Sequence, residues 1–113
     1  MFVFIYGTLK RGFPNHEKLK DISTFVCNVK SKEKHIMIDC GDGFPYLIKG
    51  YGIGFQILGE LYEISEDDID ILDEFEGVPF LYSREEIEIL IGNDIVIAQT
   101  YFKTEGIIIK EWN

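Results

Sequence analysis

The stretch that most constrains the fold is the apolar run at residues 2–6, FVFIY, which stops at Gly7. Five consecutive apolar or aromatic residues bounded by a glycine are typical of a short strand that is buried on both faces. The chain must therefore supply enough apolar material to cover this strand from two sides. Of its 113 residues, 46% are hydrophobic and 14% are aromatic, which is ample for a packed core and argues against disorder.

The turn after this strand, GTLKRG at residues 7–12, predicts an anion-binding pocket. A glycine at a strand end permits a positive φ and lets another group approach the main chain closely. Successive backbone N–H groups in such a turn can converge on a carboxylate or a phosphate, and Lys10 and Arg11 add positive charge beside it. On these residues alone, an ordinary turn after a buried strand stays an alternative.

Composition excludes several classes of partner. The formal net charge is −9, which argues against nucleic acid and against anionic membrane surfaces. The longest apolar runs are far shorter than the roughly 20 residues that a membrane span needs, and the first residues lack the pattern of a signal peptide. Cys27 and Cys40 have no metal-binding or redox spacing. We therefore expect a single domain over residues 1–113 in a reducing, cytoplasmic location.

The remaining pattern predicts many short strands and one or two helices. Strands are expected at residues 24–28, 34–38, 44–48, 55–64, 85–91, 95–102 and 107–109. Residues 44–48 suit an edge strand because Pro45 cannot donate to a ladder, and Gly59 indicates a bulge or a close approach. Residues 92–94, GND, predict a hairpin turn. This is an α+β pattern, and a small closed or nearly closed sheet would protect its edges.

Two helices are expected, a short one near residues 15–20 and a second one that starts at Ser65 and stops at Gly77. On a helical wheel Glu76 falls on the same face as Ile69 and Leu72. A carboxylate on an apolar face is costly unless it has a partner or a task. Burial, neighbouring carboxylates and the negative helix end would all raise its pKa, as a general base near neutral pH requires. By spacing alone, a solvated residue in a frayed last turn is an equal alternative.

Two sequence pieces together carry a family resemblance. Residues 6–12 read YGTLKRG and residues 14–16 read PNH, while residues 73–77 read DEFEG and are followed by Pro79 and by YSR at residues 82–84. This combination resembles the γ-glutamylcyclotransferase-like family, and within it the γ-glutamylamine cyclotransferase branch most of all. The resemblance implies a mixed β-barrel around a central cavity, with Glu76 as the catalytic residue and with no metal or organic cofactor.

The chemistry that the resemblance implies is intramolecular. The α-amine of a small γ-glutamyl compound attacks the γ-carbonyl, closes the ring of 5-oxoproline and releases an amine. Glu76 would act first as base and then as acid. The backbone N–H groups of Gly7, Thr8 and Leu9 would hold the α-carboxylate or the developing oxyanion, and Tyr6 and Tyr82 would line the cavity. Neither the amine half of the substrate nor an oligomeric state follows from the sequence; residues 22–51 resemble the family least and could shape the amine end.

Other candidate sites are weaker. His16 and His35 lack zinc-ligand spacing, and no serine or cysteine has the surroundings of a nucleophile. We expect Asn15 and His16 to fix the loop after the turn, Arg84 to pair with an acid, and Asp73 to be a solvated helix residue. The competing functional hypothesis is a non-catalytic module of the same fold that binds a small carboxylated ligand or a protein, for which an acid at position 76 would serve no purpose.

Overall fold

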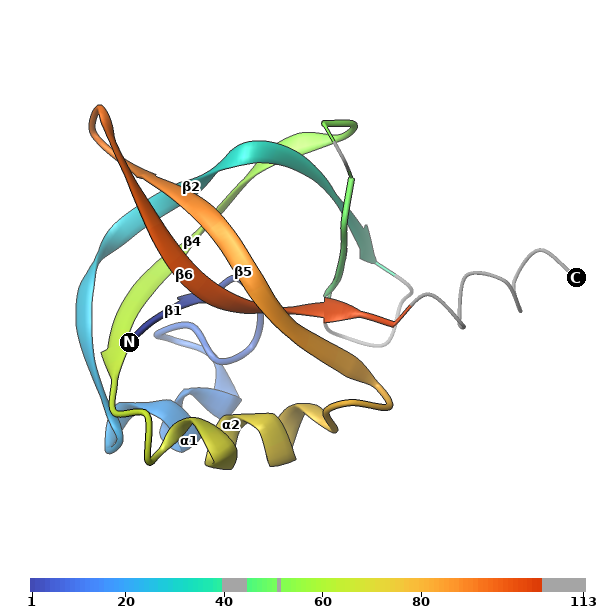
Figure 1. Cartoon of the computed structure of the whole chain (residues 1–113). Coiled ribbons are helices and arrows are strands. Elements are labelled where there is room, and N and C mark those ends of the chain that lie inside the picture. The colour runs from blue at the N-terminus through green and yellow to red at the C-terminus, as the bar shows by residue number, and fades with distance from the viewer. Residues whose placement is uncertain (40–44, 51, 105–113) are drawn as a thin grey trace, which may run out of the picture.

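The computed structural model describes residues 1–39, 45–50 and 52–104 and contains a closed, mixed β-barrel (Figure 1). The strands follow the order β3-β2-β4-β1-β6-β5, and a pairing between β2 and β5 closes the barrel. The strands are β1 (Phe2–Ile5), β2 (Ser23–Asp39), β3 (Pro45–Ile48), β4 (Phe55–Ile64), β5 (Tyr82–Ile91) and β6 (Asp94–Lys103). The predicted α+β class and small curled sheet are confirmed.

Strand β1 lies between two neighbours, antiparallel to β4 and parallel to β6. Its residues Val3, Phe4 and Ile5 are all buried. Phe4 belongs to a core cluster of strand residues, whereas Val3 and Ile5 belong to a cluster that includes Leu19, Ile69 and Leu72 of the helices. Gly59 of β4 faces this strand so closely that a Cβ there would lie 2.5 Å from the Ile5 carbonyl oxygen. The predicted close approach at Gly59 is thus confirmed.

Strand β2 corrects one prediction, since residues 24–28 and 34–38 belong to one long strand and not to two. Its register on β4 shifts between Phe25 and Cys27 and again between Lys30 and Lys34, so the polar stretch between them is a bend inside the strand. At that bend the Ser31 hydroxyl donates to the Glu33 carbonyl at 2.7 Å and accepts from the Ile57 N–H at 2.8 Å. The side chain thereby replaces the ladder bonds that the bend interrupts.

The other strands follow the expected pattern. Strand β3 pairs with β2 alone in the sheet order and is an edge strand, as Pro45 predicts. Strands β5 and β6 form the predicted hairpin, whose turn contains Gly92 at φ +60°. The strand expected at residues 107–109 and Cys40 lie outside the described residues.

Three short helical elements lie at one end of the barrel: the 3-10 turn η1 (Pro14–His16), α1 (Glu17–Lys20) and α2 (Ile69–Glu76). Helix α2 ends at Gly77, which has φ +69° as a C-terminal glycine should. It begins at Ile69 and not after Ser65, because Ser65 instead closes a preceding turn through its hydroxyl and carbonyl, to the N–H groups of Asp67 and Asp68. Ile69 and Leu72 are buried and fix α2 against the barrel.

Candidate active site

A cavity of about 240 Å³ opens at the helical end of the barrel, where β1 ends and α2 passes beneath. All six residues that were predicted as site residues line it: Tyr6, Gly7, Thr8, Leu9, Glu76 and Tyr82. Further lining residues, which the sequence analysis did not assign to the site, include Asn15, Tyr46, Phe75, Leu81, Tyr101 and Lys103. The two sequence pieces, one ending at residue 16 and the other beginning at residue 73, therefore meet at one cavity.

The turn at residues 7–9 is fixed by hydrogen bonds from the residues that follow it in the chain. The Lys10 N–H donates to the Gly7 carbonyl at 3.1 Å. The Asn15 side-chain amide donates to the Thr8 hydroxyl at 2.8 Å, and His16 Nδ1 lies 2.9 Å from the Leu9 carbonyl oxygen, to which it can donate. Asn15 and His16 thus fix the loop, as predicted. Because these two side chains contact the Thr8 hydroxyl and the Leu9 carbonyl oxygen, they do not occupy the main-chain N–H groups of the turn.

The backbone conformation of Gly7 differs from the one that the sequence predicted. It is not among the glycines with positive φ, so the predicted conformational reason is wrong. A Cβ built at Gly7 would meet no described atom within 4 Å. The absence of a side chain instead leaves open space beside the main chain of the cavity wall, where a ligand can approach the amides.

The positive charge of Lys10 and Arg11 does not line the cavity, which corrects a second expectation. The Arg11 guanidinium pairs with Glu60 at 3.1 Å and stacks 3.7 Å from the centre of the Phe25 ring. The Lys10 ammonium lies over the ring of Phe13. Both side chains therefore have partners outside the cavity, and the anion binding predicted for the turn would depend on its backbone amides alone.

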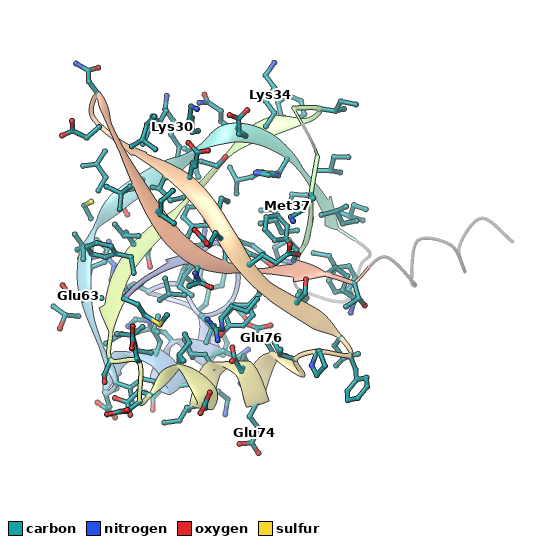
Figure 2. The ribbon with its side chains drawn as sticks, viewed as in Figure 1. Lys30, Lys34, Met37, Glu63, Glu74 and Glu76 are labelled. Atoms are coloured by element: carbon teal, nitrogen blue, oxygen red, sulfur yellow. The ribbon has the colours of Figure 1, made fainter. Side chains whose placement is uncertain are left out.

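Glu76, the last residue of α2, points toward the barrel interior, whereas Glu74 points away from it (Figure 2). Among the residues that the structure describes, none donates a hydrogen bond to the Glu76 carboxylate and none pairs with it. Burial raises the pKa of its carboxyl to about 7, and the Lys103 ammonium acts in the opposite direction. The neighbouring acids, which were expected to contribute, turn away or are paired elsewhere.

Tyrosine hydroxyls line the cavity around Glu76. Burial, followed by the nearby Tyr82 and Glu76, raises the pKa of Tyr6 well above its usual value. Tyr6 is therefore a neutral phenol at physiological pH, and its hydroxyl donates to the Tyr101 carbonyl. Burial and then Asp73 likewise raise the pKa of Tyr101. The cavity thus presents neutral polar hydroxyls, with charge confined to Glu76 and Lys103.

Asp73 was expected to be a solvated residue, and this is wrong. Its Oδ1 accepts from Arg84 Nε at 2.9 Å and from the Tyr101 hydroxyl at 2.8 Å. Arg84 also donates to Gln99 at 3.1 Å, which confirms it as the ion-pair partner of an acid. This cluster attaches α2 to β5 and β6. Because Asp73 lies one helical turn before Glu76, the attachment also fixes the position of Glu76 relative to the cavity.

No group of three or more His, Cys, Asp or Glu side chains within the described part of the chain could hold a metal ion. Among the described residues, the cavity is lined by one carboxyl group with a pKa of about 7, by several phenols, by an ammonium and by the main chain of residues 7–9. This set suits proton transfer beside an anionic, hydrogen-bonding substrate.

Comparison with known proteins agrees with this arrangement. The family model described as γ-glutamyl cyclotransferase, AIG2-like matches residues 3–112. The chain belongs to the γ-glutamyl cyclotransferase, AIG2-like family. The match spans both sequence pieces and every residue of the cavity.

Two relatives and one solved structure of the AIG2-like family show how far the likeness extends. Gamma-glutamylaminecyclotransferase A of Danio rerio is 40% identical over 98 residues, which cover 80% of this chain and 61% of the fish protein. Gamma-glutamylaminecyclotransferase of Homo sapiens is 35% identical over 97 residues, covering 81% of this chain and 63% of the human protein. This chain thus spans about three fifths of the length of these two relatives.

A crystal structure of an AIG2-like protein from Mus musculus has a TM-score of 0.83 and 31% identity, and the match covers 91% of this chain and 76% of the mouse chain. The barrel with its helical end is therefore the fold of this family. No helix among the described residues has the length and apolar character to cross a membrane.

Proposed function

We propose that this protein is a γ-glutamyl(amine) cyclotransferase, which releases 5-oxoproline and a free amine from a small γ-glutamyl compound, with Glu76 as general base and acid. The observation that carries this proposal is the half-buried Glu76 carboxylate in the cavity, which has no hydrogen-bond donor among the described residues and a pKa of about 7. A base whose pKa lies near the working pH is half available as acceptor and half available as donor, which suits a group that must do both.

The reaction conserves protons overall. Glu76 removes a proton from the α-ammonium of the substrate, and the resulting amine nitrogen attacks the γ-carbonyl carbon to form the new C–N bond of a five-membered ring. The carbonyl oxygen becomes an oxyanion in the tetrahedral intermediate. As the bond to the leaving nitrogen breaks, Glu76 returns the proton to that nitrogen. The ring nitrogen, which carries one proton more than the lactam, then passes its surplus proton to Glu76, and the released amine accepts it and leaves as an ammonium, so that Glu76 is again a carboxylate. General acid–base catalysis of this kind contributes about 10²–10⁴-fold.

The cavity supplies two further contributions. Confinement of the γ-glutamyl group in a cavity of about 240 Å³ favours the folded conformation in which amine and carbonyl meet. The amides of Gly7, Thr8 and Leu9 are available for the α-carboxylate or for the oxyanion, where fixed donors stabilise developing charge without reorganisation. Tyr6 and Tyr82 bound the same space and complete its polar lining.

The second candidate function is a non-catalytic module of the same fold that binds a carboxylated ligand. Against it stands the cost of Glu76, because a binding-only protein gains nothing from a half-buried acid that has no hydrogen-bond donor among the described residues. The cytoplasmic location expected from the sequence remains part of this proposal.

The test is incubation of the protein with a panel of γ-glutamyl compounds, with 5-oxoproline and released amine quantified in parallel. We expect the two products in a 1:1 ratio for at least one compound. The control is the same compound with its α-amine acetylated, which cannot cyclise and should release nothing. Amine release from the acetylated compound would identify a hydrolase, and no release from any compound would favour the binding module.

A further inference from the structure

A second cavity, of about 370 Å³, lies on the other face of β6 from the cavity that Glu76 lines. Tyr101 and Lys103 of β6 line the Glu76 cavity, whereas Phe102, which lies between them in the chain, lines the second one. Phe102 and Ile87 of the second cavity belong to the core cluster of strand residues, so this cavity gives access to the interior of the barrel. The mouths of β-barrels are common binding places for small ligands.

A histidine of β2 presents an unused donor to the second cavity. His35 is only 9% exposed, and its Nδ1 accepts a hydrogen bond from the Gly50 N–H at 3.2 Å. Burial lowers the pKa of His35, so the ring is neutral at neutral pH and carries its proton on Nε2. Among the described residues, none accepts from Nε2, although every buried side-chain nitrogen or oxygen there has a partner. Nε2 therefore reaches the open space of the cavity that His35 lines.

Phe102 packs against this imidazole, with the two ring centres 5.3 Å apart and the ring planes inclined at 58°. The Lys49 ammonium lies 5.7 Å from the centre of the same phenyl ring and pairs with Glu85. Lys49 is also close enough to His35 to lower the pKa of the imidazole. One side of the second cavity thus offers an N–H donor beside a positive charge, which suits a carboxylate oxygen.

Three carboxylates line the same cavity, those of Glu33, Glu86 and Glu88. Lys32 lies 3.5 Å from Glu33 and 3.3 Å from Glu88. Glu86 is exposed and forms no ion pair with any residue that the structure describes. A ligand with only a negative charge would be repelled by these acids, whereas an ammonium group can pair with Glu86. The cavity therefore suits a ligand that carries both charges.

We propose that the second cavity is a binding site for a free amino acid with an apolar side chain. The carboxylate accepts from His35 Nε2–H, the ammonium pairs with Glu86, and the side chain packs against Phe102, Ile87 and Ile97. A zwitterion satisfies the donor and the acids together, whereas a simple carboxylate or a simple amine satisfies only one of them. This site is separate from the Glu76 cavity, so its test does not depend on the cyclotransferase activity proposed above.

The test is titration of the isotope-labelled protein with leucine, followed by NMR. We expect saturable shifts of the amide signals of Gly52, Ile87 and Ile97 and none at residues 7–9. Leucinamide lacks the carboxylate and N-acetyl-leucine lacks the ammonium, so each should have a Kd about fivefold or more above that of leucine. Shifts confined to residues 7–9 would place leucine in the Glu76 cavity and overturn the proposal. Equal Kd values for the three probes, or no binding of leucine, would also overturn it.

Two variants test the assigned contacts. His35→Asn keeps an acceptor for the Gly50 N–H but removes the donor, and should raise the Kd of leucine about 10-fold. Glu86→Gln should raise it about twofold to fivefold, because the pair that it removes is exposed.

Glu63→Gln is the matched control, since it removes an exposed glutamate of β4 that does not line the second cavity (Figure 2). Its Kd for leucine should equal that of wild type. Because Glu86 lies on the surface, Glu86→Gln should fold as wild type and keeps the proposal testable where His35→Asn unfolds. A Kd for leucine that is unchanged in Glu86→Gln, or raised equally in Glu63→Gln, would overturn the assignment.

Discussion

Two glutamates withdrawn from solvent, Glu60 and Glu76, have opposite surroundings. Glu60 of β4 is 8% exposed and accepts from the Arg11 main-chain N–H at 3.0 Å, from Arg11 Nε at 3.1 Å and from the Tyr62 hydroxyl at 2.8 Å. Burial alone would raise the pKa of Glu60, but these hydrogen bonds and the Arg11 charge outweigh it, and the pKa is lowered. Glu76 is half-buried and has no such donors among the described residues, and burial raises its pKa.

The difference shows how the same side chain is made structural in one place and reactive in another. Glu60 attaches the loop after β1 to β4 and, because its pKa is lowered, is an anion at neutral pH. Glu76 exchanges a proton near neutral pH because burial is not compensated. A titratable carboxyl without partners in a cavity is a functional-site candidate, whereas a paired one is a structural element.

The largest expected effect is on turnover. Glu76→Gln keeps the shape of the side chain and removes the titrating group, so kcat should fall by about 100-fold or more. Glu74→Gln makes the same chemical change on the outer side of α2 and should leave kcat unchanged. The measurement is 5-oxoproline release at saturating substrate. Full activity in Glu76→Gln would show that Glu76 takes no part in the reaction. The proposed contrast between a structural Glu60 and a catalytic Glu76 would then be wrong.

The pH dependence of turnover should follow the raised pKa. A general base must be deprotonated, so kcat/KM should rise with pH through an inflection near 7 and fall about tenfold for each unit below it. Lys103 lowers the pKa of Glu76, so Lys103→Met should move the inflection to higher pH. The profile is measured from pH 5 to 9 with a substrate whose own ionisation is determined separately. An inflection near 4.5 would mean that Glu76 is solvated during the reaction.

Loss of the Glu60 carboxylate should affect stability and not chemistry. Glu60→Gln removes the charge that Arg11 and Tyr62 contact, and the free energy of unfolding should drop by about 1–3 kcal/mol at pH 7. Because the folded pKa is depressed, this contribution exists above the unfolded pKa and disappears as the pH falls through the folded pKa. Urea titration at pH 7 and at pH 3.5 checks it. An equal difference between wild type and variant at both pH values would contradict the assignment.

The smallest expected effect is on the stability of Glu76→Gln, and its sign is opposite to that expected for Glu60→Gln. The folded pKa of Glu76 is raised, so its contribution to stability is complete below the unfolded pKa of about 4.3 and is lost as the pH rises through 7. Glu76→Gln should therefore match wild type at pH 4 and be more stable by about 1 kcal/mol at pH 8. Thermal unfolding at the two pH values measures this difference. A variant that is less stable at pH 8 would show that Glu76 has a structural partner.

Local sequence determined the elements that carry the catalytic proposal. A run of apolar residues specifies β1, and Gly77 specifies the end of α2, because the first depends on the apolar pattern and the second on the backbone preference of glycine within a few residues. The position of Glu76 on an apolar helix face follows from a period of 3.6 residues. These features were predictable because each is encoded in neighbouring positions.

Tertiary structure alone decided which side chains share a wall or a hydrogen bond. Lys103 reaches the cavity because β6 pairs with β1 and β5, Arg11 turns to Glu60 on β4, and Asp73 is joined to Arg84 and Tyr101. The bend that makes one strand of β2 depends likewise on a hydroxyl contact with β4. Each of these depends on barrel closure, which brings together residues whose spacing along the chain carries no period. A local pattern determines the face on which a side chain lies, but the partner opposite that face is set only when the strands have found their order.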